Sequence, residues 1–137
     1  DRGADLLVDV LDAIENGTAV ASPQPDERIT LAPKLTAADA RIDWTGPAIS
    51  IDRQIRACNP NPVAWTTHRD ERVKVWLARS HPGTVLAPGM LRVDKRSATV
   101  GTGRGVLELL TVQPAGKRAM DAAAWARGLG ADPGALE

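Results

Sequence analysis

An apolar stripe at helical spacing is the first regular feature of the chain. Its members are Leu6, Leu7, Val10, Leu11 and Ile14. Acidic residues fill the opposite side, so the pattern predicts an amphipathic helix with Gly17 as its C-cap. Because an isolated helix of this length is marginal in water, the stripe needs a partner, either in this chain or in another domain.

A second helical pattern follows after a stretch without periodicity. Residues 19–33 contain three prolines and are predicted to form an extended linker, and Thr36 is placed to cap a turn over residues 37–40. A second helix is predicted to begin near residues 45–47, where Pro47 suits the first turn. Its apolar stripe is Ala48, Ile51, Ile55 and Cys58, and the Asn-Pro-Asn-Pro run at 59–62 ends it.

From about residue 64 the apolar period becomes two, which is typical of strands. Val73, Val75 and Leu77 alternate with Lys74 and Trp76. Further strand-like runs cover 84–86, 90–93, 99–100 and 106–112, with turn signals at 69–71, 81–83, 88–89, 94–97 and 101–105. Short strands with such regular turns predict a mainly β fold, a small closed barrel with flanking helices.

The end of the chain carries one more helical signal. A last helix is predicted over Asp121–Arg127, with Asp121 as its N-cap and Gly128 behind it. The tail at residues 130–137 is rich in small residues and is expected to be frayed.

The net charge of zero hides a strong asymmetry along the chain. Residues 1–33 carry a net charge of −5 and residues 34–137 a net charge of +5. Within residues 41–118 there are 13 basic and 6 acidic side chains, a net charge of +7. A basic domain favours a polyanionic partner, although on charge alone an ordinary solvated surface is an equal alternative.

No motif marks a self-contained catalytic centre. The glycine-rich run at 101–105 precedes a strand pattern rather than a helix, which predicts a hairpin turn and not a phosphate loop. Cys58 lies on an apolar stripe and is predicted to be a small buried hydrophobe, while His68 and His81 have no recognisable nucleophile nearby. We therefore predict no catalytic residue, and two His with one Cys speak against a zinc or other metal site.

The sequence contains no membrane or secretion signal, and its first residues have an unusual pattern. No apolar run approaches the roughly 20 residues that span a bilayer, and no signal-peptide pattern is present, so no membrane partner is expected. The chain opens without Met and directly in a helical pattern, which suggests a fragment boundary, and a single Cys suits a reducing cytoplasm.

Basic residues are spread over several predicted elements. Arg53 and Arg56 share a helix face, and Lys74 projects from a strand on the side opposite Val73. Lys95-Arg96 and Lys117-Arg118 lie in turns. Such a cluster can follow a phosphate backbone. Trp76 beside Lys74 is placed to stack on a base, but a core or rim position is the preferred interpretation.

Three segments resemble one family, the methionyl-tRNA formyltransferases. Ala32–Thr36 with Ala40–Trp44 resembles its "KL…EARIDW" segment, and Gln54–Trp65 is similar to "IRAFNPWPGAW". Gln113–Met120, QPAGKRAM, resembles "LQPAGKKPM" just before the last helix. The order and spacing agree over roughly residues 5–128.

The resemblance implies a domain organisation and an activity. Residues 1–21 would be the last helix of a truncated Rossmann-like formyltransferase domain, 22–38 an interdomain linker, and 39–137 an OB-like, C-terminal tRNA-binding barrel. The family formylates the amino group of initiator methionyl-tRNA with 10-formyltetrahydrofolate. Its Asn-His-Asp catalytic set lies in that N-terminal domain and nothing in this chain matches it, so this chain is expected to be non-catalytic and to hold no cofactor. A monomeric, cytoplasmic parent enzyme is expected.

The resemblance and the charge together give a set of expected RNA contacts. They are Lys34, Arg41, Arg53, Arg56, Lys74, Lys117 and Arg118. Two alternatives stay open: the scaffold domain of a related sugar-nucleotide or folate formyltransferase or hydrolase, and a purely structural domain that dimerises through the first helix.

Overall fold

The computed structural model describes residues 2–27, 29–83 and 86–137, which divide into two units. The N-terminal unit comprises Asp1–Pro33 and the C-terminal unit Lys34–Glu137. Helix α1 (Arg2–Glu15) belongs to the N-terminal unit, and none of its residues, all of them described, is buried. Gly17 has φ +68°, and Thr18 N donates to the Ala13 carbonyl, so the predicted glycine C-cap is confirmed.

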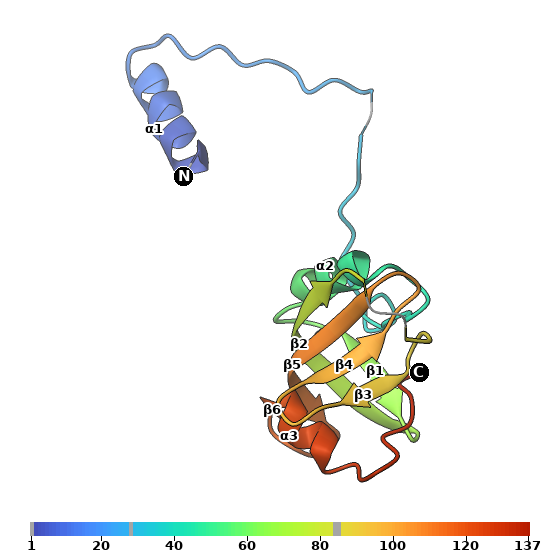
Figure 1. The fold of residues 1–137 in the computed structure, drawn as a ribbon. Helices are drawn as coiled ribbons and strands as arrows, with labels where there is room; N and C mark the ends of the chain where they lie inside the picture. The colour runs from blue at the N-terminus through green and yellow to red at the C-terminus, as the bar shows by residue number, and fades with distance from the viewer. Residues whose placement is uncertain (1, 28, 84–85) are drawn as a thin grey trace. The chain divides into compact units, whose positions relative to one another are not determined.

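The C-terminal unit is built on one antiparallel sheet (Figure 1). Its strands are β1 (Trp65–His68), β2 (Glu71–His81), β3 (Leu91–Val93), β4 (Ala98–Gly101), β5 (Val106–Pro114) and β6 (Met120–Asp121). They follow the order β1-β2-β5-β4-β3, and β6 pairs with β5 off this path. The curved sheet forms a half-barrel with helices at its ends, so the predicted mainly β class with flanking helices is confirmed, whereas the described strands run as an open path from β1 to β3 and not as the closed barrel expected.

The C-terminal segment joins the two edges of this half-barrel. Glu137 exchanges two backbone hydrogen bonds of 2.9 Å with Thr67 of β1, while Leu136 N donates to Gly89 O (2.8 Å) beside β3. Leu136 is 3% exposed. The prediction of a frayed tail is therefore wrong: unpaired backbone groups of two edge strands and an apolar slot hold the tail in place. A run of small residues carries no sign of such a partner.

Helices α2 (Ala48–Ala57) and α3 (Ala122–Arg127) flank the sheet, α2 near one end and α3 near the other (Figure 1). The predicted stripe of α2 is confirmed, since all four of its members are at most 3% exposed. Pro47 precedes α2 as its N-cap with φ −66°. In α3 the predicted cap is also confirmed, because Asp121 Oδ1 accepts from Ala124 N at 2.7 Å.

The predicted alternation in β2 holds only in part. Val73 and Val75 are buried as expected, but Leu77 is 48% exposed and Ala78 takes the inward position. The reason is a shift of register against β5 between Val75 and Ala78, because a β-bulge turns the following side chains to the other face. Of the strand predicted at 84–86, residues 84 and 85 lie outside the described residues, and Leu86 is in no strand.

The glycine-rich run at 101–105 is the predicted hairpin turn between β4 and β5. Gly103 N donates to the carbonyls of Trp44 and Gly46, both at 3.0 Å. A Cβ on Gly103 would overlap the carbonyl of Thr45, so the close approach requires glycine. The loop amide is thus used to hold the chain before α2 and not to bind a phosphate.

Candidate nucleic-acid interface

Trp65 of β1 is the centre of a cluster of cations on the outer face of the sheet. Its ring is half-buried and its Nε1 donates to the Ala37 carbonyl at 2.6 Å, which fixes the ring. The guanidinium carbon of Arg72 lies 4.0 Å from the ring centroid and that of Arg41 lies 5.6 Å from it. Both arginines make cation–π contacts with one indole and are held by it.

The register of the sheet extends this cluster across three strands. Lys74 of β2 lies opposite Trp65 and also opposite Gln113 of β5. Arg72 is two residues before Lys74 and shares its face. Trp76 is half-buried, and its Nε1 donates to Gln113 Oε1 (3.0 Å), whose Nε2 in turn donates to the Lys117 carbonyl (2.9 Å). We name as the basic stripe Arg41, Trp65, Arg72, Lys74, Trp76, Gln113 and Lys117.

The cations of the basic stripe are not neutralised by acids. Within the described residues, no carboxylate lies in ion-pair range of Arg41, Arg72, Lys74 or Lys117. In contrast, Arg56 Nε lies 3.2 Å from Asp52 Oδ2 on α2. The stripe therefore presents net positive charge beside two partly exposed indoles, a combination that attracts a polyanion carrying flat rings.

The structure brings together three of the seven residues expected to contact RNA. Arg41 and Lys74 are in the basic stripe with their side chains, Lys117 joins it through its main-chain carbonyl, and Arg118 is exposed beside Lys117 in the same loop. The remaining three lie on other elements. Arg53 and Arg56 are exposed on α2, and Lys34 is exposed at the start of the C-terminal unit.

Trp65 and Arg72 are site residues that the sequence pattern did not single out. The sequence did predict a turn at 69–71, and this turn is what brings the two residues into the site. In the structure it is a two-residue turn, Arg69–Asp70, in which both residues have positive φ. Such a turn fixes the pairing of the strands that it joins, so counting back from it places Lys74 opposite Trp65. Trp76 lies at the rim of the sheet, in agreement with the core or rim position preferred from the sequence. Its indole N–H donates a hydrogen bond to Gln113.

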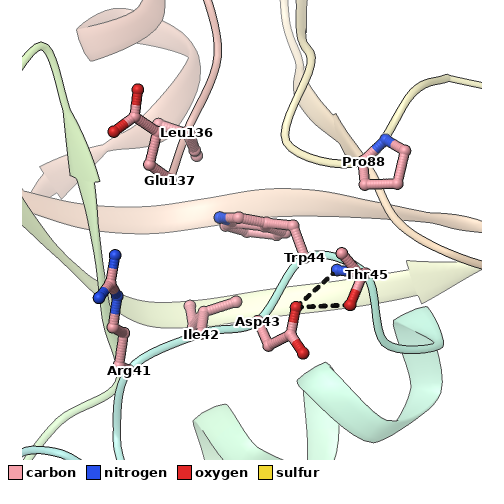
Figure 2. Close-up of a pocket in the computed structure, with 8 residues that line it drawn as sticks. All are labelled: Arg41, Ile42, Asp43, Trp44, Thr45, Pro88, Leu136 and Glu137. Atoms are coloured by element: carbon pink, nitrogen blue, oxygen red, sulfur yellow. Dashed lines mark hydrogen bonds between the residues drawn. The ribbon is translucent and has the colours of Figure 1, made fainter.

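A hollow of about 420 Å³ adjoins Arg41 at one end of the stripe (Figure 2). Residues 41–45 line one side of it, and Pro88, Leu136 and Glu137 line the rest. Asp43 Oδ1 accepts hydrogen bonds from Thr45 Oγ1 (2.7 Å) and Thr45 N (2.9 Å), which lower the pKa of that carboxyl below its usual range. The Asp43 carboxylate is therefore a capping group in this hollow and is poorly suited to act as a base.

The cysteine and the histidines each have a separate structural environment. Cys58 is buried, as predicted, and burial raises the pKa of its thiol. His68 Nε2 is 2.8 Å from the Pro133 carbonyl, and His81 Nε2 is 2.9 Å from Glu108 Oε2. Among the described residues no group of three or more His, Cys, Asp or Glu side chains is arranged to hold a metal ion. No helix in the described part of the chain is long and apolar enough to cross a membrane.

Known proteins show the same domain. Residues 34–130 match the family model described as formyl transferase, C-terminal domain. The methionyl-tRNA formyltransferase of Streptomyces coelicolor is 53% identical over 127 residues, which cover 92% of this chain and 41% of the relative. That of Salinispora tropica is 51% identical over 128 residues, with 93% and 42% covered. The resemblance predicted from three segments is confirmed, and the chain spans about two fifths of the length of these relatives.

Solved structures support the fold at lower identity. A structure of HypX from Aquifex aeolicus superposes with a TM-score of 0.67 at 19% identity, covering 92% of this chain and 22% of HypX. A structure of HypX in complex with tetrahydrofolic acid gives a TM-score of 0.58 at 21% identity, covering 88% and 22%. At these identities the likeness concerns the fold alone.

Proposed function

The chain belongs to the family of formyl transferase C-terminal domains, and from this premise we propose that it is the tRNA-binding part of a methionyl-tRNA formyltransferase. The whole enzyme would move a formyl group from 10-formyltetrahydrofolate to the amino group of initiator methionyl-tRNA. The catalytic groups would lie in another domain of the polypeptide, since this chain corresponds to about two fifths of each named relative. We place the protein in the cytoplasm as a monomer, where a single buried cysteine stays reduced.

The N-terminal unit fits this proposal as a remnant of the catalytic domain. The stripe of α1 is exposed, with Leu6 at 63% and Ile14 at 61%, and a helix of this kind needs an apolar surface to cover it. We propose that residues 1–21 form the last helix of a Rossmann-like domain and residues 22–38 the linker. Residues 39–137 would then be the RNA-binding domain.

The basic stripe is the observation that carries the proposal. Its four cations, which have no ion-pair partner among the described residues, suit phosphate oxygens, and its arginines over Trp65 offer flat, charged surfaces for bases. A cation–π contact at an exposed site contributes about 0.5–1 kcal/mol, enough to restrict Arg72 before RNA arrives. Since phosphates are the main target, we expect weak sequence preference and strong salt dependence.

The test is the binding of an initiator tRNA transcript to the 137-residue chain over a range of salt concentrations. The double variant Arg72→Ala/Lys74→Ala should bind more weakly, and the slope of log K against log salt should fall by about 1.4–1.8, because each phosphate contact contributes about 0.7–0.9. Arg79→Ala is the matched control: Arg79 is exposed farther along the same strand, opposite Glu108 and beyond the last stripe member on β2, Trp76. Equal slopes for all three proteins would refute an RNA-binding stripe and favour a scaffold for a small-molecule formyltransferase.

A further inference from the structure

A second group of cations lies where the β3–β4 turn meets the end of α3. Lys95 and Arg96 come from the turn and Arg127 from the last turn of α3, and we name these three residues the turn patch. They line a hollow of about 550 Å³ together with Asp121 and Ala123. Lys95 and Arg127 also line a neighbouring hollow of about 650 Å³. The three side chains thus border concave surface.

Hydrogen bonds fix the backbone of the β3–β4 turn and the side chain of Arg127. Arg127 Nη1 donates to the Lys95 carbonyl at 2.9 Å, which ties the end of α3 to the turn. Asp94 N donates to the Ser97 carbonyl (2.9 Å), which closes the turn itself. α3 is anchored in the core by Ala126, which is fully buried. Arg127 is thus already positioned and loses less conformational entropy when an anion binds.

The nearby acids are used elsewhere. Asp94 Oδ2 lies 3.7 Å from Arg92 Nε and accepts from Ser97 Oγ at 3.3 Å. Asp121 accepts the helix-capping bond from Ala124 N. Within the described residues no carboxylate is in ion-pair range of Lys95, Arg96 or Arg127. The residues that line the hollow of about 550 Å³ therefore carry a net charge of +2, even when Asp121 is counted. Positive charge with no internal partner favours an anionic ligand.

The turn patch continues the basic stripe around the end of the sheet. Lys117, the last member of the stripe, and Arg118 precede β6, and β6 pairs with β5 through Asp121 and Met120. Asp121 also lines the hollow of about 550 Å³ that the turn patch borders. The path from stripe to patch therefore crosses only the short β6, and one flexible polyanion can follow both.

We propose that the turn patch binds phosphate groups of the same RNA whose backbone lies along the basic stripe. This inference rests on the proposed function and extends its site. RNA is favoured over a free anion because the two basic surfaces are joined by Lys117 and Arg118, and a polymer of phosphates fits a track better than a point site does. The patch contributes affinity without sequence preference, since Lys and Arg contact phosphate oxygens that every nucleotide carries.

The test compares Lys95→Ala/Arg96→Ala with the wild-type chain in tRNA binding over a range of salt concentrations. Arg127 is left intact because it ties α3 to the turn. We expect the slope of log K against log salt to fall by about 1.4–1.8, as for two lost phosphate contacts. Arg79→Ala again serves as control. A short single-stranded RNA that reaches only the stripe should bind the wild type and the double variant equally.

The outcomes separate the inference from the proposed function. If Arg72→Ala/Lys74→Ala lowers the slope and Lys95→Ala/Arg96→Ala does not, the turn patch is ordinary surface and the inference fails alone. If the wild-type chain binds no tRNA, the proposed function fails. Should the double alanine variant melt early, Lys95→Gln/Arg96→Gln keeps the side-chain stems and removes the same charge, so an unchanged slope in that variant also overturns the inference.

Discussion

Helices α1 and α2 carry apolar stripes of the same kind but have opposite environments. In α2, Ile51 and Ile55 are 3% and 1% exposed against the sheet, whereas in α1, Leu7 and Leu11 are 58% and 55% exposed. Periodicity shows that a helix has a face to bury; it does not show where the covering surface is. The sheet supplies that surface for α2 in this chain. We propose that the catalytic domain supplies it for α1.

The largest expected effect is a difference in stability between variants of the apolar faces of α2 and α1. Ile55→Ala should lower the free energy of unfolding of the C-terminal unit by about 2–5 kcal/mol, because the substitution leaves a cavity in a close-packed core. Leu11→Ala in α1 should change it by less than about 0.5 kcal/mol, as is usual for exposed positions. Denaturant titration of both variants, followed by the fluorescence of the buried Trp44 and Trp125, gives the comparison. Equal losses would show that α1 is packed in the core.

The two extended segments of the chain form a parallel contrast. Leu31 in the linker is 87% exposed, and Leu136 in the C-terminal segment is 3% exposed. Leu136→Ala should destabilise the C-terminal unit by about 2–5 kcal/mol, nearer the lower value because a segment at a chain end can relax into the space. Leu31→Ala is the matched control and should leave the unfolding midpoint unchanged. A midpoint that is the same for both variants would contradict the joining role of residues 134–137.

These contrasts show how much of the fold the sequence could predict. Local signals sufficed for α1, for the stripe of α2, for the Asp121 cap and for the glycine hairpin, because each depends on neighbours within a few residues. The docking of Leu136 and the exposure of Leu77 depend on partners far along the chain: the edges of β1 and β3, and a bulge opposite β5. No local pattern contains that information.

The candidate site, like the fold, was predictable from the sequence only where local signals define it. Lys74, Lys117 and Arg118 were found as basic residues, but single cations on separate elements do not reveal which of them meet. Trp65 and Arg72 enter the site only through strand register, since a cross-strand neighbour is set by the turn that joins the strands. Arg56 shows the opposite case, where an adjacent acid at helical spacing, Asp52, already pairs with the cation.

A smaller effect tests whether the end of α3 contributes to the stability of the C-terminal unit while the end of α1 does not. Asp121→Ala removes the cap of α3 and should lower the free energy of unfolding of the C-terminal unit by about 1 kcal/mol. Gly17→Ala forces a side chain into positive φ and should fray α1 at a local cost of about 1–2 kcal/mol. The second change should reduce helical circular dichroism without moving the melting temperature of the C-terminal unit. A shift in that temperature would mean that the two units unfold together.

The smallest expected effect concerns pH. Hydrogen bonds from Thr36 to Asp39 and from Thr45 to Asp43 lower the pKa of both carboxyls below their usual range. A lowered pKa in the folded state means that the charged form is favoured by folding, so the contribution is present above the unfolded pKa of 3.8 and is lost as pH falls through the folded value. Thr45→Ala should return the pKa of Asp43 toward the usual value and leave that of Asp39 unchanged. Carboxyl carbon NMR titration checks this, and a pKa of Asp43 that does not respond would show that the Thr45 hydroxyl is not its cause, since the backbone N–H of residue 45 remains in the variant. The loss belongs to the segment before α2, which contains both carboxyls, so acid should loosen this segment first.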